Sequence, residues 1–143
     1  MVQHTGEMTT NKIWRVAVLG AKGRMGSEAV RAVNTAADMD LVAALGSADP
    51  LTKLLDVKAD IIIDLTVPTA TEANVRFAVE HGIHAVVGTT GWNEERLSSL
   101  KQLLGEHPGV GVLIAPNFAI GSILATEFAA KAARYFDSAE IIE

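Results

Sequence analysis

The stretch that decides the fold is Ile13–Gly26, IWRVAVLGAKGRMG. Its first part is apolar and rich in valine, as expected of a buried β-strand, and it runs directly into Gly20, Gly23 and Gly26, spaced three apart. Residues 26–37, GSEAVRAVNTAA, then carry valines at helical spacing. The stretch therefore predicts a strand, a tight glycine turn and a helix in direct succession.

The rest of the chain repeats this alternation of short apolar runs with longer runs of helical period. The pattern predicts strands at residues 13–20, 40–46, 59–66, 83–91, 109–117 and 138–143, and helices at residues 26–37, 69–82, 93–105 and 122–136. Such a succession indicates an α/β fold, a doubly wound, mainly parallel Rossmann-type sheet with helices on both faces. The length of 143 residues fits one domain, residues 13–143, behind a disordered leader of residues 1–12.

Polar and glycine residues at helix ends give further local expectations. Thr69 or Thr71 is expected to cap the start of the helix at residues 69–82, and Gly82 to supply a left-handed turn at its end. Asn93 is the expected cap of the next helix.

Composition argues against several classes of function. A net charge of −5 offers no basic face to nucleic acid, and the absence of cysteine leaves no thiol chemistry or thiolate zinc site. The four histidines do not pair with carboxylates at metal-ligand spacing, so no metal is expected. The apolar region 110–128 is interrupted by Pro116, Asn117 and Gly121, and the N-terminus lacks the apolar core of a signal peptide. We therefore expect a cytoplasmic protein that binds neither nucleic acid nor membrane.

The glycine turn is the first candidate site. Glycines at such a turn allow a tight exit from the strand, a close approach of the backbone to a pyrophosphate, and close packing of the helix on the sheet. Backbone N–H groups at the helix start then face the diphosphate. The alternative is a turn that merely needs glycine's permissive backbone. We expect dinucleotide binding by Gly20, Ala21, Lys22, Gly23, Arg24, Met25 and Gly26.

The neighbouring charges bear on which dinucleotide is bound. Lys22 and Arg24 are either solvated surface charges or ligands of the adenosine phosphates. A site that reads NAD usually has an acidic residue at the end of the second strand, about 20 residues beyond the glycine turn. Gly46 and Ser47 stand there instead, and Asp49 is three residues late, so it can be a loop residue. We predict that NADPH is tolerated or preferred over NADH.

Three other strand ends carry polar residues, and ligands of open parallel sheets bind beyond such ends. GTTG, residues 88–91, can hydrogen-bond a nicotinamide amide, a ribose or a substrate carboxylate, or can simply cap the next helix. APNF, residues 115–118, offers the Asn117 amide and backbone groups, or is a proline-containing turn. Asp64 is expected to have a structural role, orienting Thr66 or capping a turn. No nucleophile stands beside a base, which argues against a hydrolase.

Four motifs, in order VAVLGAKGRMG, DLTVP, HGIHAVVGTTGW and VLIAPNFAIG, resemble the N-terminal domain of bacterial dihydrodipicolinate reductase. The resemblance covers nearly all of residues 13–143. It implies transfer of hydride from NADH or NADPH to a cyclic dicarboxylate imine derived from 4-hydroxy-tetrahydrodipicolinate, in lysine and diaminopimelate biosynthesis. A nicotinamide dinucleotide and a small dicarboxylate are the implied ligands.

The resemblance also implies roles for individual segments. Residues 20–25 match the pyrophosphate turn, and the acidic residue that reads the ribose in some members has no match at Gly46. Thr90 matches the threonine that also meets a substrate carboxylate. The residues expected beside the nicotinamide are Gly88, Thr89, Thr90, Ala115, Pro116, Asn117 and Phe118.

Family members continue from a sequence like SAEIIE, residues 138–143, into a His-His-x-x-Lys-x-Asp-Ala-Pro-Ser-Gly-Thr-Ala segment that opens the substrate-binding and tetramer-forming domain. The printed sequence lacks that segment, so we expect no catalytic acid or base within it, cofactor binding without turnover, and a monomer or weak dimer where the full-length family is homotetrameric. The alternatives are a non-enzymatic nucleotide-sensing module and the cofactor domain of another amino-acid-related dehydrogenase.

Overall fold

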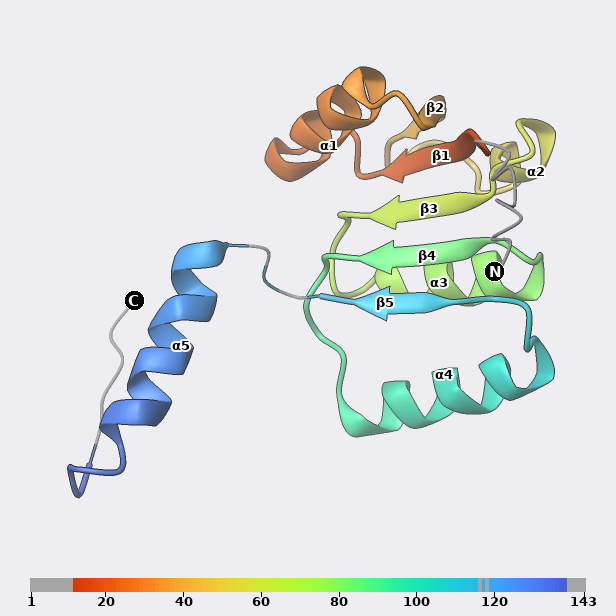
Figure 1. Cartoon of the computed structure of the whole chain (residues 1–143). Coiled ribbons are helices and arrows are strands. Elements are labelled where there is room, and N and C mark those ends of the chain that lie inside the picture. The colour runs from red at the N-terminus through yellow and green to blue at the C-terminus, as the bar shows by residue number, and fades with distance from the viewer. Residues whose placement is uncertain (1–11, 116, 118, 139–143) are drawn as a thin grey trace, which may run out of the picture.

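The computed structural model describes residues 12–115, 117 and 119–138, and within them it forms one parallel sheet with flanking helices (Figure 1). The strands are β1 (Trp14–Leu19), β2 (Met39–Leu45), β3 (Ile61–Asp64), β4 (His84–Val87) and β5 (Val112–Ile114), in spatial order β2-β1-β3-β4-β5. The helices are α1 (Arg24–Thr35), α2 (Lys53–Asp56), α3 (Thr71–Glu80), α4 (Glu94–Glu106) and α5 (Ile120–Ala132).

This architecture confirms the doubly wound α/β fold predicted from the sequence. β1, β3, β4 and β5 are shorter at their ends than predicted, because the flanking polar and glycine residues belong to the connections, whereas β2 keeps seven residues and begins one residue earlier than expected. The short helix α2 was not predicted, since four residues carry no helical period. The sixth strand, expected at residues 138–143, lies outside the described residues except for Ser138, and the leader lies outside them except for Lys12.

The strand order creates a switch point at the centre of the sheet. From β1 the chain passes to β2 on one side, whereas β3, β4 and β5 follow one another on the other side. Because crossovers between parallel strands are right-handed, α1 and the pair α3 and α4 fall on opposite faces. The carboxyl ends of β1 and β3, which are neighbours in register, therefore border the crevice where ligands of such folds bind.

The core lies mainly between the sheet and the helices α2, α3 and α4. In β3 and β4 alternate residues are buried, as strand geometry requires, so that Ile62 and Ala85 face these helices. They join one apolar cluster with Val75 and Val79 of α3 and Leu100 of α4. The opposite face is covered by α1 next to β1 and β2.

The last described helix stands apart from the sheet (Figure 1). None of the residues of α5 is buried, and Ile120 and Phe128 are 75% and 61% exposed. The helix was expected at residues 122–136 and occupies 120–132. Within the described ranges no helix is long and apolar enough to cross a membrane.

The structure confirms two of the predictions made for the helix ends and contradicts one. Gly82 has φ +74° after α3, and Asn93 Oδ1 accepts a hydrogen bond of 2.9 Å from the Arg96 backbone N–H at the start of α4, as predicted. The predicted threonine cap of α3 is wrong. Ala70 is the N-cap and makes no side-chain bond, while Thr71 lies fully buried inside the first turn and its Oγ1 has no partner among the described residues. Burial of Thr71 against the core outweighs the capping bond.

The core predicts a clear difference between two isoleucines. Ile62→Ala, at a fully buried position in β3, is expected to lower the free energy of unfolding by about 2–5 kcal/mol because it leaves a cavity. Ile123→Ala removes the same atoms from a half-exposed site on α5 and is expected to change it by less than about 0.5 kcal/mol. Urea unfolding followed by circular dichroism measures both, and equal losses would contradict the described core.

Candidate functional site

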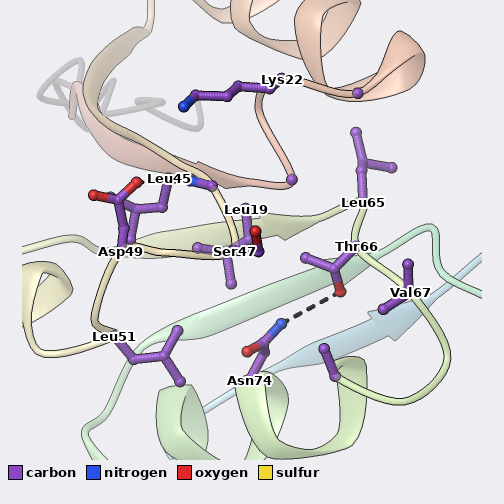
Figure 2. Close-up of a pocket in the computed structure, with 14 residues that line it drawn as sticks. Leu19, Lys22, Leu45, Ser47, Asp49, Leu51, Leu65, Thr66, Val67 and Asn74 are labelled. Atoms are coloured by element: carbon purple, nitrogen blue, oxygen red, sulfur yellow. Dashed lines mark hydrogen bonds between the residues drawn. The ribbon is translucent and has the colours of Figure 1, made fainter.

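A cavity of about 610 Å³ opens beyond the carboxyl ends of β1, β2 and β3 (Figure 2). Its size and its mixture of apolar walls with a few polar groups are typical of small-molecule sites. The lining residues come from the glycine turn, the end of β2, the end of β3 and the start of α3: Leu19, Gly20, Lys22, Gly23, Leu45, Gly46, Ser47, Asp49, Leu51, Leu65, Thr66, Val67, Ala70 and Asn74.

The glycine turn brings the exits of β1 and β3 into contact. Gly20 has φ +75°, and a Cβ at this position would collide with the backbone carbonyl of Leu65. A Cβ on Gly26, in the first turn of α1, would collide with the carbonyl of Gly20. Gly23 is the N-cap of α1, and its backbone N–H donates a hydrogen bond of 3.0 Å to the oxygen of Gly20. The turn is thus as tight, and the helix as close to it, as the sequence predicted.

Helix α1 begins at this turn with its amide groups facing the crevice side of the sheet. The N-terminal N–H groups of a helix lack acceptors within the helix and carry a partial positive charge. No side chain caps α1, and no acidic residue lies in its first turn. The helix start is therefore electrostatically suited to an anionic group.

Two charged residues, Lys22 and Asp49, line the cavity at the end of β2. Figure 2 shows Lys22 extending from the glycine turn toward this end, and its Cδ and Cε lie 3.7 Å from the point that a Cβ on Gly46 would occupy. Asp49 Oδ2 accepts a hydrogen bond of 2.9 Å from the Gly46 N–H, and its Oδ1 pairs with Lys53. These bonds to Lys53 and Gly46, and the nearby charge of Lys22, hold the pKa of the Asp49 carboxyl below its ordinary value.

Asp49 is therefore a loop residue, as the sequence suggested, with its carboxylate bonded inside its own turn. It nevertheless lines the cavity, which the sequence did not predict. Its spacing of three residues from Gly46 and four from Lys53 was the available signal, because both contacts are local.

A buried carboxylate lies beneath the other end of the cavity. Asp64, the last residue of β3, is fully buried and accepts hydrogen bonds at Oδ1 from the backbone N–H of Thr66 (3.0 Å), the Thr66 hydroxyl (2.6 Å) and the Thr89 hydroxyl (3.1 Å). Its Oδ2 accepts from the Asn74 amide (3.1 Å). The expectation that Asp64 orients Thr66 is confirmed. The bonds to Asn74 and Thr89 are additional and connect β3, α3 and the GTTG segment.

Two of these partners were missed as candidate site residues. Thr66 and Asn74 both line the cavity. The signal for Thr66 was its place in DLTVP, at the end of a strand. For Asn74 it was a polar residue at the fourth position of a helix whose apolar neighbours face the core. The other candidates at the glycine turn divide: Gly20, Lys22 and Gly23 line the cavity, whereas Ala21, Arg24, Met25 and Gly26 do not.

The GTTG segment lies along the same edge of the sheet but outside this cavity. Gly88 donates its backbone N–H to the carbonyl oxygen of Asp64 at 2.9 Å, which fixes the exit of β4 to that of β3. Thr89 is buried with its hydroxyl bonded to Asp64, whereas Thr90 is exposed. Gly91 has φ +95° and approaches Pro68 closely.

The segment after β5 is described only in part, because Pro116 and Phe118 lie outside the described residues. The Ala115 N–H donates to the Val87 carbonyl oxygen at 2.8 Å, which places this residue beside the exit of β4. Asn117 Nδ2 donates to Ser122 Oγ at 2.6 Å, and its Oδ1 accepts from the Ala119 N–H at 2.9 Å. The Asn117 side chain is thus engaged at the start of α5. Among the described residues no group of His, Asp and Glu could hold a metal ion.

Comparisons with known proteins agree with this architecture. The family described as dihydrodipicolinate reductase, N-terminus, matches residues 14–118. Curated proteins named 4-hydroxy-tetrahydrodipicolinate reductase from Streptomyces griseus and Corynebacterium urealyticum are 57% and 50% identical over 129 residues, which cover 90% of this chain and 52% of theirs. The chain therefore spans about half the length of the curated relatives it matches.

Solved structures give the same assignment at the level of the fold. Dipicolinate-bound dihydrodipicolinate reductase from Paenisporosarcina sp. TG-14 is similar with a TM-score of 0.74 and 31% identity, over 87% of this chain and 55% of that one. Scyllo-inositol dehydrogenase from Lactobacillus casei, with NAD(H) and scyllo-inositol bound, has a TM-score of 0.64 at 13% identity over 85% of this chain and 42% of its own, which shows a shared fold alone. The chain belongs to the dihydrodipicolinate reductase family and corresponds to its N-terminal domain.

Proposed function

We propose that this chain is the NAD(P)H-binding domain of a cytoplasmic reductase that transfers hydride to 4-hydroxy-tetrahydrodipicolinate in lysine and diaminopimelate biosynthesis. The observation that carries the proposal is the cavity at the switch point of the sheet. It borders the glycine turn and the exits of β2 and β3. The names of the curated relatives support the reaction and disfavour the sensing module and the other dehydrogenases considered above. When bound, the cofactor supplies the hydride.

The pyrophosphate is assigned to the turn at residues 20–26. Close backbone approach is possible there because Gly20 and Gly26 have no side chains, and the start of α1 offers N–H groups without an opposing carboxylate. In this assignment Ala21, Arg24 and Met25 contribute backbone groups from outside the cavity wall, and Lys22 reaches the adenosine ribose.

The adenosine half is assigned to the cavity itself. Its apolar walls, formed by Leu51, Val67 and Ala70, suit a flat base, and Lys22 with Ser47 stands where a ribose 2′-phosphate would lie. Gly46 places no carboxylate there, and Asp49 is bonded to Gly46 and Lys53. These contacts support NADPH as a tolerated or preferred cofactor.

The nicotinamide half is assigned to the exits of β4 and β5, residues 88–90 and 115–118. The exposed Thr90 is free to meet a substrate carboxylate, whereas Thr89 holds the segment in place through Asp64. Since the Asn117 side chain is engaged with Ser122 and Ala119, this residue would offer its backbone rather than its amide to the cofactor. Pro116 and Phe118 keep the role implied by the family resemblance.

We assign the substrate-binding and tetramer-forming domain to the half of the reductase that this chain does not span. Two observations support this assignment. The one carboxylate among the described residues that line the cavity, that of Asp49, is bonded to Gly46 and Lys53, and α5 presents Ile120, Ile123, Leu124 and Phe128 on exposed surface, as expected of a helix that packs against further protein. The 143-residue chain alone is then a monomer or weak dimer, and the complete reductase a homotetramer.

The proposed function predicts a cofactor preference. NADPH is expected to bind at least as tightly as NADH, and Lys22→Met is expected to weaken NADPH about tenfold, or about 1.4 kcal/mol, with little effect on NADH. Lys131→Met, on α5, is the matched control and should change neither dissociation constant. Isothermal titration calorimetry measures all of them. NADH binding at least tenfold tighter than NADPH would contradict the preference.

The second prediction concerns the pyrophosphate turn. Gly26→Ala is expected to displace the turn, lowering the free energy of unfolding by about 1–3 kcal/mol and weakening NADPH and NADH alike. Gly105→Ala, also a helical glycine but with open space around it, is expected to stabilise the protein by about 0.4–1 kcal/mol and to leave binding unchanged. Unaltered cofactor binding by the Gly26 variant would count against this location of the pyrophosphate.

The third prediction concerns turnover. The 143-residue chain is expected to bind NADPH yet to leave it unoxidised when 4-hydroxy-tetrahydrodipicolinate is generated in the same solution, as followed by the absorbance of the reduced nicotinamide. Normal turnover by this chain would show that the half it does not span is dispensable for the reaction.

A further inference from the structure

The amide of Asn74 has a fixed orientation at the wall of the cavity. Asn74 is the fourth residue of α3, half-buried, and lines the space between Leu51 and Thr66 (Figure 2). Its Nδ2 donates to Asp64 Oδ2 at 3.1 Å and to Thr66 Oγ1 at 3.3 Å. Both hydrogens of the amide nitrogen are therefore used within the protein.

The chemistry of Asp64 and Thr66 determines which end of the amide faces them. A carboxylate accepts hydrogen bonds only, and Asp64 already accepts from the Thr66 N–H, the Thr66 hydroxyl and the Thr89 hydroxyl. Because Thr66 gives its single hydroxyl proton to Asp64, its oxygen can only accept from Asn74. A flipped amide would set the Asn74 oxygen against two acceptors. Oδ1 therefore faces the cavity.

This carbonyl oxygen is available to a ligand. Figure 2 shows Oδ1 directed away from Thr66 and toward the side of the cavity formed by Leu51. No donor within the part of the chain that the structure describes bonds to it. A half-buried acceptor beside apolar walls favours a ligand that brings a hydrogen-bond donor on a flat apolar body.

We propose that Asn74 Oδ1 accepts a hydrogen bond from the exocyclic 6-amino group of adenine and so selects adenine dinucleotides over those with a 6-oxopurine base. The inference rests on the proposed function, which assigns the adenosine half to this cavity. A 6-oxo group presents an acceptor where adenine presents a donor, and two opposed acceptors leave Oδ1 unsatisfied. The selectivity thus originates in Asp64, which acts on the base through Asn74.

The test compares two ligands that differ only at the base. NADPH and nicotinamide hypoxanthine dinucleotide phosphate share their riboses, phosphates and nicotinamide, so the ratio of their dissociation constants isolates the 6-position together with the adjacent N1, which is an acceptor in adenine and an N–H donor in hypoxanthine. The protein is expected to bind NADPH at least tenfold more tightly. Asn74→Leu, which keeps an apolar side chain of similar size, is expected to bring the ratio close to one, mainly by weakening NADPH.

Two further variants separate an effect on base selection from a general loss of cofactor binding or of folded protein. Asp64→Asn removes the obligate acceptor, so the amide of Asn74 is free to flip and the ratio is expected to fall. Lys22→Met is the matched control at the opposite wall: it should weaken both ligands by the same factor and leave the ratio unchanged. Because each ratio is measured on one preparation, a fraction of unfolded protein cancels.

The outcomes distinguish this inference from the proposed function. Equal binding of NADPH and its hypoxanthine analogue by the unmodified protein, or an unchanged ratio in Asn74→Leu, would overturn the inference and leave the proposed cofactor site intact. Failure of both dinucleotides and of NADH to bind would overturn the proposed function and this inference with it.

Discussion

The carboxylate of Asp64 is the contact on which the ligand-binding edge of this domain depends. It lies at zero exposure at the end of β3 and is stabilised by four donors from the β3 exit, α3 and the GTTG segment. A buried charge is tolerated only when it is paired or well hydrogen-bonded, so these segments cannot separate without a large energetic cost. The carboxylate thereby ties together three segments that the sheet alone would leave independent: the β3 exit, the start of α3 and the GTTG segment.

The glycine turn after the neighbouring strand β1 allows a close approach of backbone segments that side chains would prevent. Gly20 and Gly26 let the exit of β1, the carbonyl of Leu65 and the start of α1 approach one another more closely than any side chain permits. The backbone of the turn, at Gly20 and Gly23, therefore forms part of the cavity lining. In the proposed function, polar specificity comes from a small number of groups on the walls, notably Lys22 at one end and Asn74 at the other.

The sequence predicted what is local and missed what depends on tertiary contact. The strand, the glycine turn, the left-handed Gly82 and the Asn93 cap all follow from residues within a few positions of one another. Asn74 and Thr89 are ten and 25 residues from Asp64. The packing of α3 against β3 brings Asn74 to it, and the parallel register of β3 and β4 brings Thr89. The threonine cap failed for the same reason, since burial of Thr71 is decided by α3 packing on the sheet. The position of α5, away from the sheet, likewise has no local signal.

The residue at position 46, at the end of β2, can be substituted without strain in the backbone. Its backbone conformation is an ordinary one, and a Cβ would meet nothing nearer than 3.7 Å, so an added Cβ fits without strain. Glycine and aspartate codons differ by a single base. In the proposed function, an acidic residue that entered at the end of β2 in one mutational step would place a second carboxylate beside Asp49 and repel a 2′-phosphate.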